Sequence, residues 1–525
     1  MKIGTSDIGA IDAKEEFDGV TISEDDFFDR LLIPDSIDLE KFRIGGRYFF
    51  YGFRGVGKTS LLRYMVFSSQ PKAYARKIIL FKSEVSETQR TEISQQAGFE
   101  WTNPDPAKME FSQDFKASWQ WFVCHKIGEL IQESALLVTD DVHSQAFLRL
   151  LGLTHKKYDK VLGYLPRLKG GRIRVAADAE FIKAELEGDF EYRSEKEGTV
   201  VFEALVAKLI RVLERVSFKE RIVLGFDELE AFHISREQYD RDLRLVRDLA
   251  FSVDRINKAM RLSGRPIYLY CAIRSEVLGA MGALGQEVDR LVYDRGTNIV
   301  WHHAPRSLEH PLLNVVRKKI KASIAGFVGD PIVSLFPDEL QGELLEVFLL
   351  DRSFYRPRDL MWRLSLAIED FPNATKFSED VLLRTEGEYS NRLWAEIEYE
   401  ISAIYTPEEI EAITTVLSGA PRYFRLQDVV QRAKQREHSS EVLRVLNVRE
   451  NWADILRNLY RLGAIGNNFR SGSRGQFRNR WVFRGDKTLL VDEQMEINPA
   501  LAKHLSAIDP RRRGGRGRKR PATRG

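Results

Sequence analysis

The chain has 525 residues, of which 43% are hydrophobic and 30% charged, a composition that predicts a globular protein of about two to four domains. Its two cysteines, Cys124 and Cys271, are too few for a disulfide framework or a cysteine-rich zinc site. No apolar run reaches the roughly 18 residues of a membrane span. The N-terminus lacks the basic and then apolar pattern of a signal peptide. We therefore expect a protein of the reducing cytoplasm.

The formal net charge of +3 hides an uneven distribution of charge along the chain. Residues 510–525 hold eight of the 80 Lys and Arg residues and no acid, which leaves 72 basic against 77 acidic residues elsewhere. Because this tail has a single alanine and no larger apolar side chain to bury, we expect it to be disordered. It either binds nucleic acid electrostatically or serves only as a solvated solubility tail.

After an N-terminal segment, residues 1–40, a glycine-rich loop follows the first predicted strand. Residues 47–51, RYFFY, form a short aromatic run typical of a buried strand, and residues 59–70, TSLLRYMVFSSQ, have helical spacing. The loop between them matches the pattern G-x-x-x-x-G-K-[ST] at Gly52, Gly57, Lys58 and Thr59. A chance glycine turn is the alternative, but the order of strand, loop and helix favours a phosphate-binding loop.

The residue types of this loop suit phosphate chemistry. Glycines let backbone N–H groups surround a β-phosphate without obstruction by side chains, and the helix N-terminus adds a positive dipole. Lys58 reaches the β- and γ-phosphates in such a loop, and the Thr59 hydroxyl is a ligand of Mg²⁺. The predicted nucleotide-binding residues are Gly52, Phe53, Arg54, Gly55, Val56, Gly57, Lys58, Thr59 and Ser60.

Further apolar runs, separated by helical segments, indicate a parallel α/β sheet. They are residues 78–82, 222–226, 267–272 and 298–301.

The run at residues 222–226 leads directly into two carboxylates, in the sequence IVLGFDELE. This is the Walker B arrangement: Asp227 would hold Mg²⁺ directly or through water, and Glu228 is placed to polarise the attacking water as a general base. Two surface acids at a strand end are the alternative. The chain has no N-K-x-D motif, so a GTPase is not favoured.

The next strand ends at Arg274, in YCAIRSEV. A charged residue at this strand tip would sense the γ-phosphate, whereas the alternative is an arginine that only caps the sheet edge. Arg290 and Arg295, further along, are candidate arginine fingers for a neighbouring subunit, although surface charge is the simpler interpretation of both.

These motifs resemble the ASCE division of P-loop ATPases, which includes the AAA+ and STAND proteins. An arginine that closes the fourth strand is similar to the STAND pattern in particular. The resemblance covers about residues 41–364 and implies a five-stranded sheet in the order 5-1-4-3-2, with ATP and Mg²⁺ as ligands. We therefore expect an α/β P-loop core over residues 41–305.

One departure from that family is large, because 169 residues separate Lys58 from Asp227 (227 minus 58). We interpret the excess, about residues 100–216, as a helical insertion that acts as a partner-binding or lid element. Its amphipathic patches lie at residues 115–131 and 200–216. Its middle, residues 169–195, is either helical or a hairpin.

A second arginine pair opens a predicted helix in the sequence YRPRDLM, with Pro357 suited to the first helical position. In the resembling ATPases a helical lid follows the sheet, here residues 306–400, and an arginine at such a helix start reaches the γ-phosphate. The resemblance implies this role for Arg358 or Arg356, which would stabilise transition-state charge. The alternative is a capped helix with an ion pair between Arg358 and Asp359.

Residues 401–509 show the order of a winged helix. Thr406 and Pro407 begin a predicted helix, further helices are expected at 424–433 and 451–462, and residues 463–486 read as strand, loop and strand. The exposed face of 451–462 would present Ala453, Asp454, Arg457, Asn458 and Arg461 to DNA. The loop adds Arg470, Arg474, Arg478, Arg480 and Arg484. Protein docking or autoinhibition is the alternative role.

The motifs GFRGVGKTSLL, FDELE and YRPRDLM together are also similar to bacterial standalone P-loop ATPases with a C-terminal winged helix, which often occur in mobile or defence-related loci. The first hypothesis is an ATP-hydrolysing switch coupled to DNA or a protein partner, with possible homo-oligomers. The second is a non-catalytic, STAND-like signalling scaffold. The third is a DNA-binding regulator or loader whose assembly ATP controls.

Overall fold

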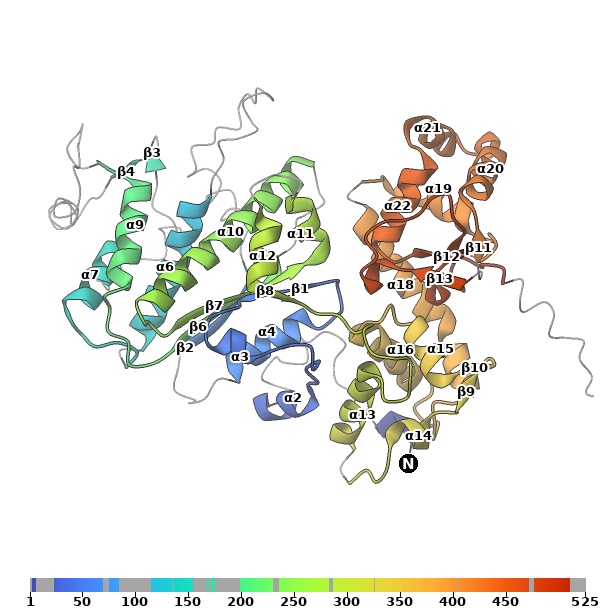
Figure 1. Cartoon of the computed structure of the whole chain (residues 1–525), viewed down its shortest axis with the longest axis horizontal. Coiled ribbons are helices and arrows are strands. Elements are labelled where there is room, and N and C mark those ends of the chain that lie inside the picture. Colours follow the sequence, from blue (N-terminus) through green and yellow to red (C-terminus); the bar gives the residue numbers. More distant parts are fainter. Residues whose placement is uncertain are drawn as a thin grey trace, which may run out of the picture. The chain divides into compact units, whose positions relative to one another are not determined.

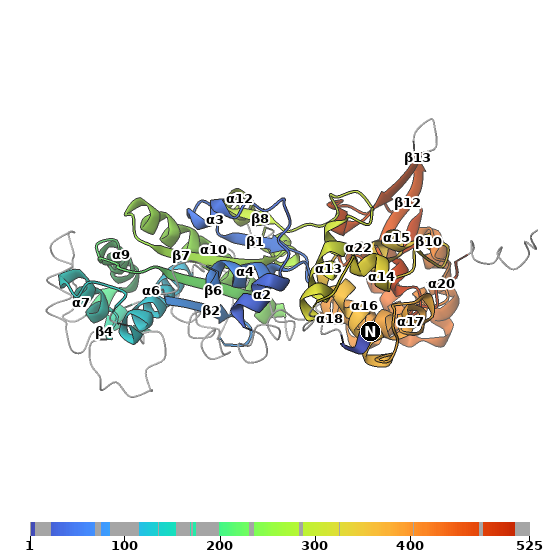
Figure 2. The same ribbon diagram turned by 90° about the horizontal axis from the view of Figure 1, so that it is seen from below.

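The computed structural model describes residues 2–5, 23–68, 75–84, 115–134, 136–153, 168–169, 172–174, 199–229, 236–282, 287–324, 326–402, 404–471 and 476–509. The chain divides into two compact units (Figures 1 and 2). The sheet unit comprises Asp35–Gly52 and Lys58–Ile299, and the C-terminal unit comprises Met1–Pro34, Phe53–Gly57 and Val300–Gly525. This division is coarser than the domains expected from the sequence.

The sheet unit is built on five parallel strands in the spatial order β2-β6-β7-β1-β8. Numbered along the chain, this is the order 5-1-4-3-2, so the predicted α/β fold class and strand order are confirmed. The strands are β1 (Phe49–Gly52), β2 (Ala75–Leu80), β6 (Ile222–Leu229), β7 (Ile267–Arg274) and β8 (Gly296–Asn298).

The fifth strand was predicted at residues 298–301, and that position is wrong. β8 ends at Asn298 because it follows the register of the short β1, in which Phe49 faces Gly296 and Tyr51 faces Asn298.

Helices cover both faces of the sheet, so its strands are buried on both sides, as parallel strands usually are. Figure 1 shows α10 (Arg236–Leu262), α11 (Ser275–Gly282) and α12 (Val288–Arg295) on one face and α3 (Glu40–Arg43) and α4 (Lys58–Phe67) on the other. Strand residues such as Phe49, Leu224 and Leu269 are fully buried in the resulting core.

The insertion between β2 and β6 contains both helices and strands. The predicted helical patches are confirmed as α6 (Lys116–Glu133) and α9 (Phe202–Leu213), with α7 (Val142–Leu150) beside α9. A small antiparallel sheet joins β3 (Leu168–Lys169), β4 (Arg172–Arg174) and β5 (Thr199–Val201). The hairpin alternative is therefore found at the start of the stretch 169–195, most of which lies outside the described residues.

The first part of the C-terminal unit is helical, as expected for residues 306–400. Its helices are α13 (Pro311–Ser323), α14 (Pro331–Leu335), α15 (Leu345–Asp351), α16 (Pro357–Asp370), α17 (Glu379–Arg384) and α18 (Glu386–Ile401). A two-residue hairpin, β9 (Glu339–Leu340) with β10 (Glu343–Leu344), interrupts them. N-terminal residues pack here too, because α2 (Glu24–Arg30) contacts α13 and the Ile3 amide donates to the Ala374 carbonyl at 2.6 Å.

The second part follows the element order predicted for residues 401–509. It has α19 (Pro407–Leu417), α20 (Leu426–Arg436), α21 (Glu441–Arg449) and α22 (Trp452–Arg461). An antiparallel sheet in the order β11-β14-β12-β13 joins them, with β11 (Tyr423–Phe424), β12 (Ile465–Ser471), β13 (Gln476–Arg480) and β14 (Met495–Ile497). Thr406 caps α19 in a reciprocal box with Glu409.

Two details of the C-terminal prediction are wrong. The helix expected from residue 424 begins at Leu426, because Tyr423 and Phe424 pair with β14. Ala453, expected on the exposed face of α22, is only 5% exposed because it lies among the buried residues of the first turn. Arg474 and the tail 510–525 lie outside the described residues.

No helix within the described ranges is long and apolar enough to cross a bilayer. Cys124 and Cys271 are both buried free thiols.

Candidate functional site: a P-loop and a Walker B strand

The glycine loop has the backbone that its sequence requires. β1 ends at Gly52, and α4 begins at Lys58. Between them Gly55 has φ +80° and Gly57 has φ +98°, in the region that favours glycine. The Lys58 ammonium donates to the Gly52 carbonyl at 3.0 Å, so the side chain folds back over the loop. Only 9% of Lys58 is exposed.

Asp227 lies next to Lys58 and Thr59 despite their separation in sequence. The carboxylate is hydrogen-bonded to the Thr59 side chain and faces the positive charges of Lys58 and Arg63. Its Oδ1 also accepts the Glu228 amide at 2.8 Å. Burial raises the pKa of Asp227 above its ordinary value, while these partners lower it. The fold therefore brings together the two predicted metal ligands, Thr59 and Asp227.

A break in the strand register presents Glu228. The pairing of β6 with β7 is irregular between Phe226 and Leu229, and Glu228 has φ +55°. Such irregularities often re-aim a side chain beside an active site. The Glu228 Oε2 accepts the Ser83 hydroxyl at 2.6 Å and the Ser83 amide at 3.1 Å. Glu228 is thus held by a residue that follows β2, the strand next to β6.

The arginine at the end of β7 lies beside the loop. Arg274 is the last residue of that strand and is in register with Gly52 of β1. The two candidate fingers lie on α12, where Arg290 is exposed and paired with Glu287 at 3.2 Å and Arg295 is the last residue of the helix. Their proposed role in another subunit stays a prediction.

Loop residues Phe53–Gly57 belong to the C-terminal unit and are held by its backbone and side chains. The Arg358 amide donates to the Gly55 carbonyl at 3.3 Å, and the Trp301 indole donates to the Val56 carbonyl at 3.0 Å. Arg54 pairs with Glu400 at 3.4 Å. The loop backbone is therefore held at two successive carbonyls.

Arg358 also joins a buried charge cluster at the start of α16. Its Nη2 lies 2.5 Å from Glu396 and its Nε lies 3.5 Å from Asp359. Arg356 lies 3.8 Å from Asp359 and stacks over Phe354. Asp359 is fully buried, and this desolvation raises its pKa to about 6 despite the two arginines. Arg358 therefore pairs with Asp359 and contacts the glycine loop through its backbone amide, and its role at a γ-phosphate stays a prediction.

Several residues at the site carry no signal in the sequence. They belong to no motif, and each lies far along the chain from its partner or on an ordinary helix. These residues are Ser83, Arg63, Trp301, Glu396 and Glu400. Only the folded chain shows that Ser83 and Glu228, 145 positions apart, share a hydrogen bond.

The side chains fit a magnesium ion held jointly with phosphate. The described residues contain no group of three His, Cys, Asp or Glu side chains that could hold a metal. Mg²⁺ usually takes one or two protein ligands and completes its octahedron with water and substrate phosphates. A buried carboxylate beside a hydroxyl, as at Asp227 and Thr59, is such a partial site.

Comparison with known proteins reaches only part of the chain. Residues 310–398 match a family model described as the FunZ-associated C-terminal helical domain. This region runs from α13 into α18 and includes Arg356 and Arg358, but neither the P-loop nor Asp227. No curated protein matches the chain.

Among solved structures, the chain is similar to the ORC2 protein of Aeropyrum pernix in its ADPNP and ADP complexes. The identity is 12% and the TM-score 0.35, and the alignment covers 84% of this chain and 86% of that one. A similarity at this identity and TM-score does not show a shared function.

Proposed function

We propose that this protein binds ATP with Mg²⁺ and hydrolyses it. The observation that carries the proposal is the meeting of Lys58, Thr59 and Asp227 at the carboxyl ends of the parallel strands β1 and β6. Ligands of open α/β sheets bind at this edge. A positive loop, a hydroxyl and a buried carboxylate are the groups that a nucleoside triphosphate and its metal require.

The loop residues bind and orient the phosphates. Backbone N–H groups from Gly52 to Ser60 face the phosphate oxygens, and Lys58 leaves the Gly52 carbonyl to neutralise the β- and γ-phosphates. When bound, Mg²⁺ supplies Lewis-acid neutralisation of the phosphate charge. Thr59 and Asp227 would hold it. Burial raises the pKa of Asp227, whereas a cation bound beside the carboxylate would favour its ionised form.

Glu228 is the general base in this proposal. It is next to the metal ligand, and its carboxylate is within reach of solvent at the strand end. A protein that only bound nucleotide would gain nothing from a second carboxylate at this position, which favours hydrolysis over a STAND-like scaffold. Arg274 and Arg358 are proposed as γ-phosphate sensors, from β7 and α16 respectively, and Arg356 is the weaker candidate.

Coupling of this cycle to DNA or a protein partner through the C-terminal helices and sheet is part of the same proposal. The proposal also includes assembly into a homo-oligomer and a role in bacterial defence or mobile elements.

Nucleotide binding by Lys58→Ala tests the proposal. We expect wild type to bind ATP in a Mg²⁺-dependent manner and Lys58→Ala to lose this binding. The matched control is Lys41→Ala, since Lys41 is an exposed lysine of the same unit that pairs with Asp38. Equal ATP affinity of wild type and Lys58→Ala would overturn the proposal.

A further inference from the structure

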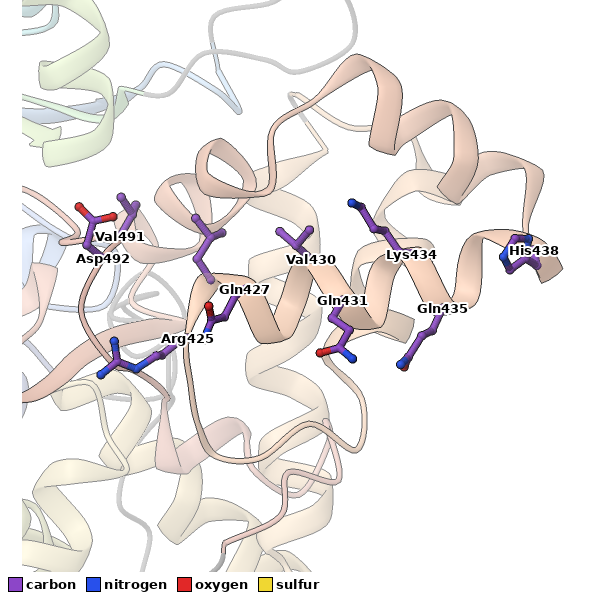
Figure 3. Close-up of a pocket in the computed structure, with 10 residues that line it drawn as sticks. Arg425, Gln427, Val430, Gln431, Lys434, Gln435, His438, Val491 and Asp492 are labelled. Atoms are coloured by element: carbon purple, nitrogen blue, oxygen red, sulfur yellow. The ribbon is translucent and has the colours of Figure 1, made fainter.

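The exposed face of α20 carries cationic and amide side chains beside the apolar Leu426 and Val430 (Figure 3). It borders an open groove of about 980 Å³ that Val491 and Asp492 also line, near the start of the helix. The outward side chains are Arg425, Gln427, Gln431, Lys434, Gln435 and His438. From Gln427 onward their spacing is that of one helix face.

Five of these side chains, all except that of Arg425, have no partner within the described part of the chain. Gln427, Gln431, Lys434, Gln435 and His438 make no side-chain hydrogen bond or ion pair with any described residue. The opposite side of α20 is anchored, because Val429 and Ala433 are buried and Arg432 donates to the carbonyls of Val416 and Ser418 at 3.0 and 2.7 Å. The buried side of α20 is thus anchored to the rest of the unit, and its glutamine side chains are exposed to solvent.

The face of α22, where the sequence predicted DNA contacts, is different. Arg457 pairs with Asp454 at 2.5 Å, Asn458 donates to the Tyr405 hydroxyl at 2.9 Å, and Arg461 donates to Asn458 at 3.2 Å. Their polar groups are therefore already engaged with neighbours on or beside α22.

The last described residues lie beside the segment that leads into α20. Asp509, the last described residue, pairs with Arg422 at 3.1 Å, and the Arg422 amide donates to the Ile508 carbonyl at 2.9 Å. Arg422 stands four residues before the first residue of α20. The eight Lys and Arg residues of 510–525 follow Asp509 in the sequence.

We propose that α20 binds double-stranded DNA by lying in the major groove, an inference that deepens the DNA coupling of the proposed function. The major groove of B-DNA admits an α-helix, whereas that of A-form RNA is too narrow for side chains to read. Glutamine makes paired hydrogen bonds to adenine, and lysine and arginine contact guanine or phosphate. Gln427, Gln431 and Gln435 are the base-reading candidates. The tail supplies sequence-independent phosphate contacts.

Fluorescence anisotropy of the full chain with a labelled duplex of about two helical turns, without nucleotide, tests this inference. The variant Gln431→Ala/Lys434→Ala/Gln435→Ala is expected to bind at least about tenfold more weakly than wild type. The control Arg457→Ala/Arg461→Ala on α22 is expected to stay within about twofold. All five side chains lie on helix surfaces, and equal thermal unfolding midpoints confirm that the variants are folded.

Removal of residues 511–525 is expected to weaken binding to all duplexes and to flatten the fall in affinity between about 50 and 200 mM salt. The inference is overturned if wild type does not bind the duplex or if the α22 control loses binding while the α20 variant keeps it. It is also overturned if single-stranded RNA or polyglutamate binds as tightly as the duplex. These measurements need no nucleotide, so their failure leaves the ATPase proposal standing.

Discussion

The Arg358 amide, in the first turn of α16, donates to the carbonyl of Gly55 in the glycine loop at 3.3 Å. First-turn amides of a helix have no partner within the helix, so this bond uses a group that would otherwise be unsatisfied. A Cβ at position 55 would lie 3.0 Å from the Arg358 Nε. The loop conformation and the start of α16 are therefore packed as one element.

Gly55→Ala is expected to destabilise the protein. Gly55 has φ +80°, so alanine would be strained there and would also crowd Arg358. The expected loss in the free energy of unfolding is on the order of 1–2 kcal/mol, measured by urea denaturation. Gly387→Ala is the control, because Gly387 lies in α18 with open space around it and should gain rather than lose stability. Equal effects of both changes would contradict the packing described.

Arg358→Ala is expected to lower ATP turnover by about 10- to 100-fold, since a preorganised cation at the transferred phosphate is removed. It should also lower the free energy of unfolding by roughly 1–3 kcal/mol, because Asp359 and Glu396 lose a partner. Steady-state kinetics and urea denaturation measure the two effects. Arg392→Ala on α18, which removes a solvent-exposed ion pair with Glu388, serves as the control. Wild-type turnover by Arg358→Ala would remove the sensor role.

Ser83→Ala is expected to raise the basal ATP turnover. The Ser83 hydroxyl holds the Glu228 carboxylate at 2.6 Å, and a carboxylate that accepts fewer hydrogen bonds is a stronger base. A net hydrogen-bond energy of about 1 kcal/mol corresponds to about a fivefold change in rate. Ser263→Ala, just after α10, is the control because its hydroxyl donates to the Ala259 and Met260 carbonyls of that helix. A fall in turnover would mean that Ser83 orients Glu228 for catalysis.

The stability of the C-terminal unit should depend on pH through His310. This buried imidazole caps α13 by accepting the Leu312 amide at Nδ1, at 3.2 Å, which requires its neutral form. Burial lowers its pKa from 6.5 to about 4, so the unfolded chain binds more protons between these values and stability falls as the pH drops from 6.5 toward 4. His310→Asn keeps the cap and should flatten this dependence in chemical denaturation at pH 7 and pH 5. Parallel curves for both proteins would contradict the assignment.

The sequence was sufficient to find the glycine loop, the strand that ends at Asp227 and the parallel sheet, because these depend on local patterns. Glycine spacing predicts the loop, and hydrophobic periodicity predicts the strand before Asp227 and the helix after Lys58. Strand order followed from the family resemblance.

Contacts between distant segments were beyond the sequence. Ser83 meets Glu228 only because β2 and β6 pair, with Leu80 opposite Asp227. Trp301 reaches the Val56 carbonyl only through the fold of the C-terminal unit. Helical spacing also could not show that the polar side chains of α22 are engaged whereas those of α20 are exposed. Asn458 of α22 is hydrogen-bonded to Tyr405, which belongs to neither helix.

Single-turnover hydrolysis of γ-labelled ATP by wild type and Glu228→Gln tests the central claim most directly, namely that Asp227 and Glu228 serve a hydrolytic site. Glu228→Gln keeps the size and burial of the side chain but removes the base. We expect it to bind ATP with wild-type affinity and to hydrolyse it at least about 100-fold more slowly. Hydrolysis at the wild-type rate by Glu228→Gln, or none by the wild type, would contradict the account.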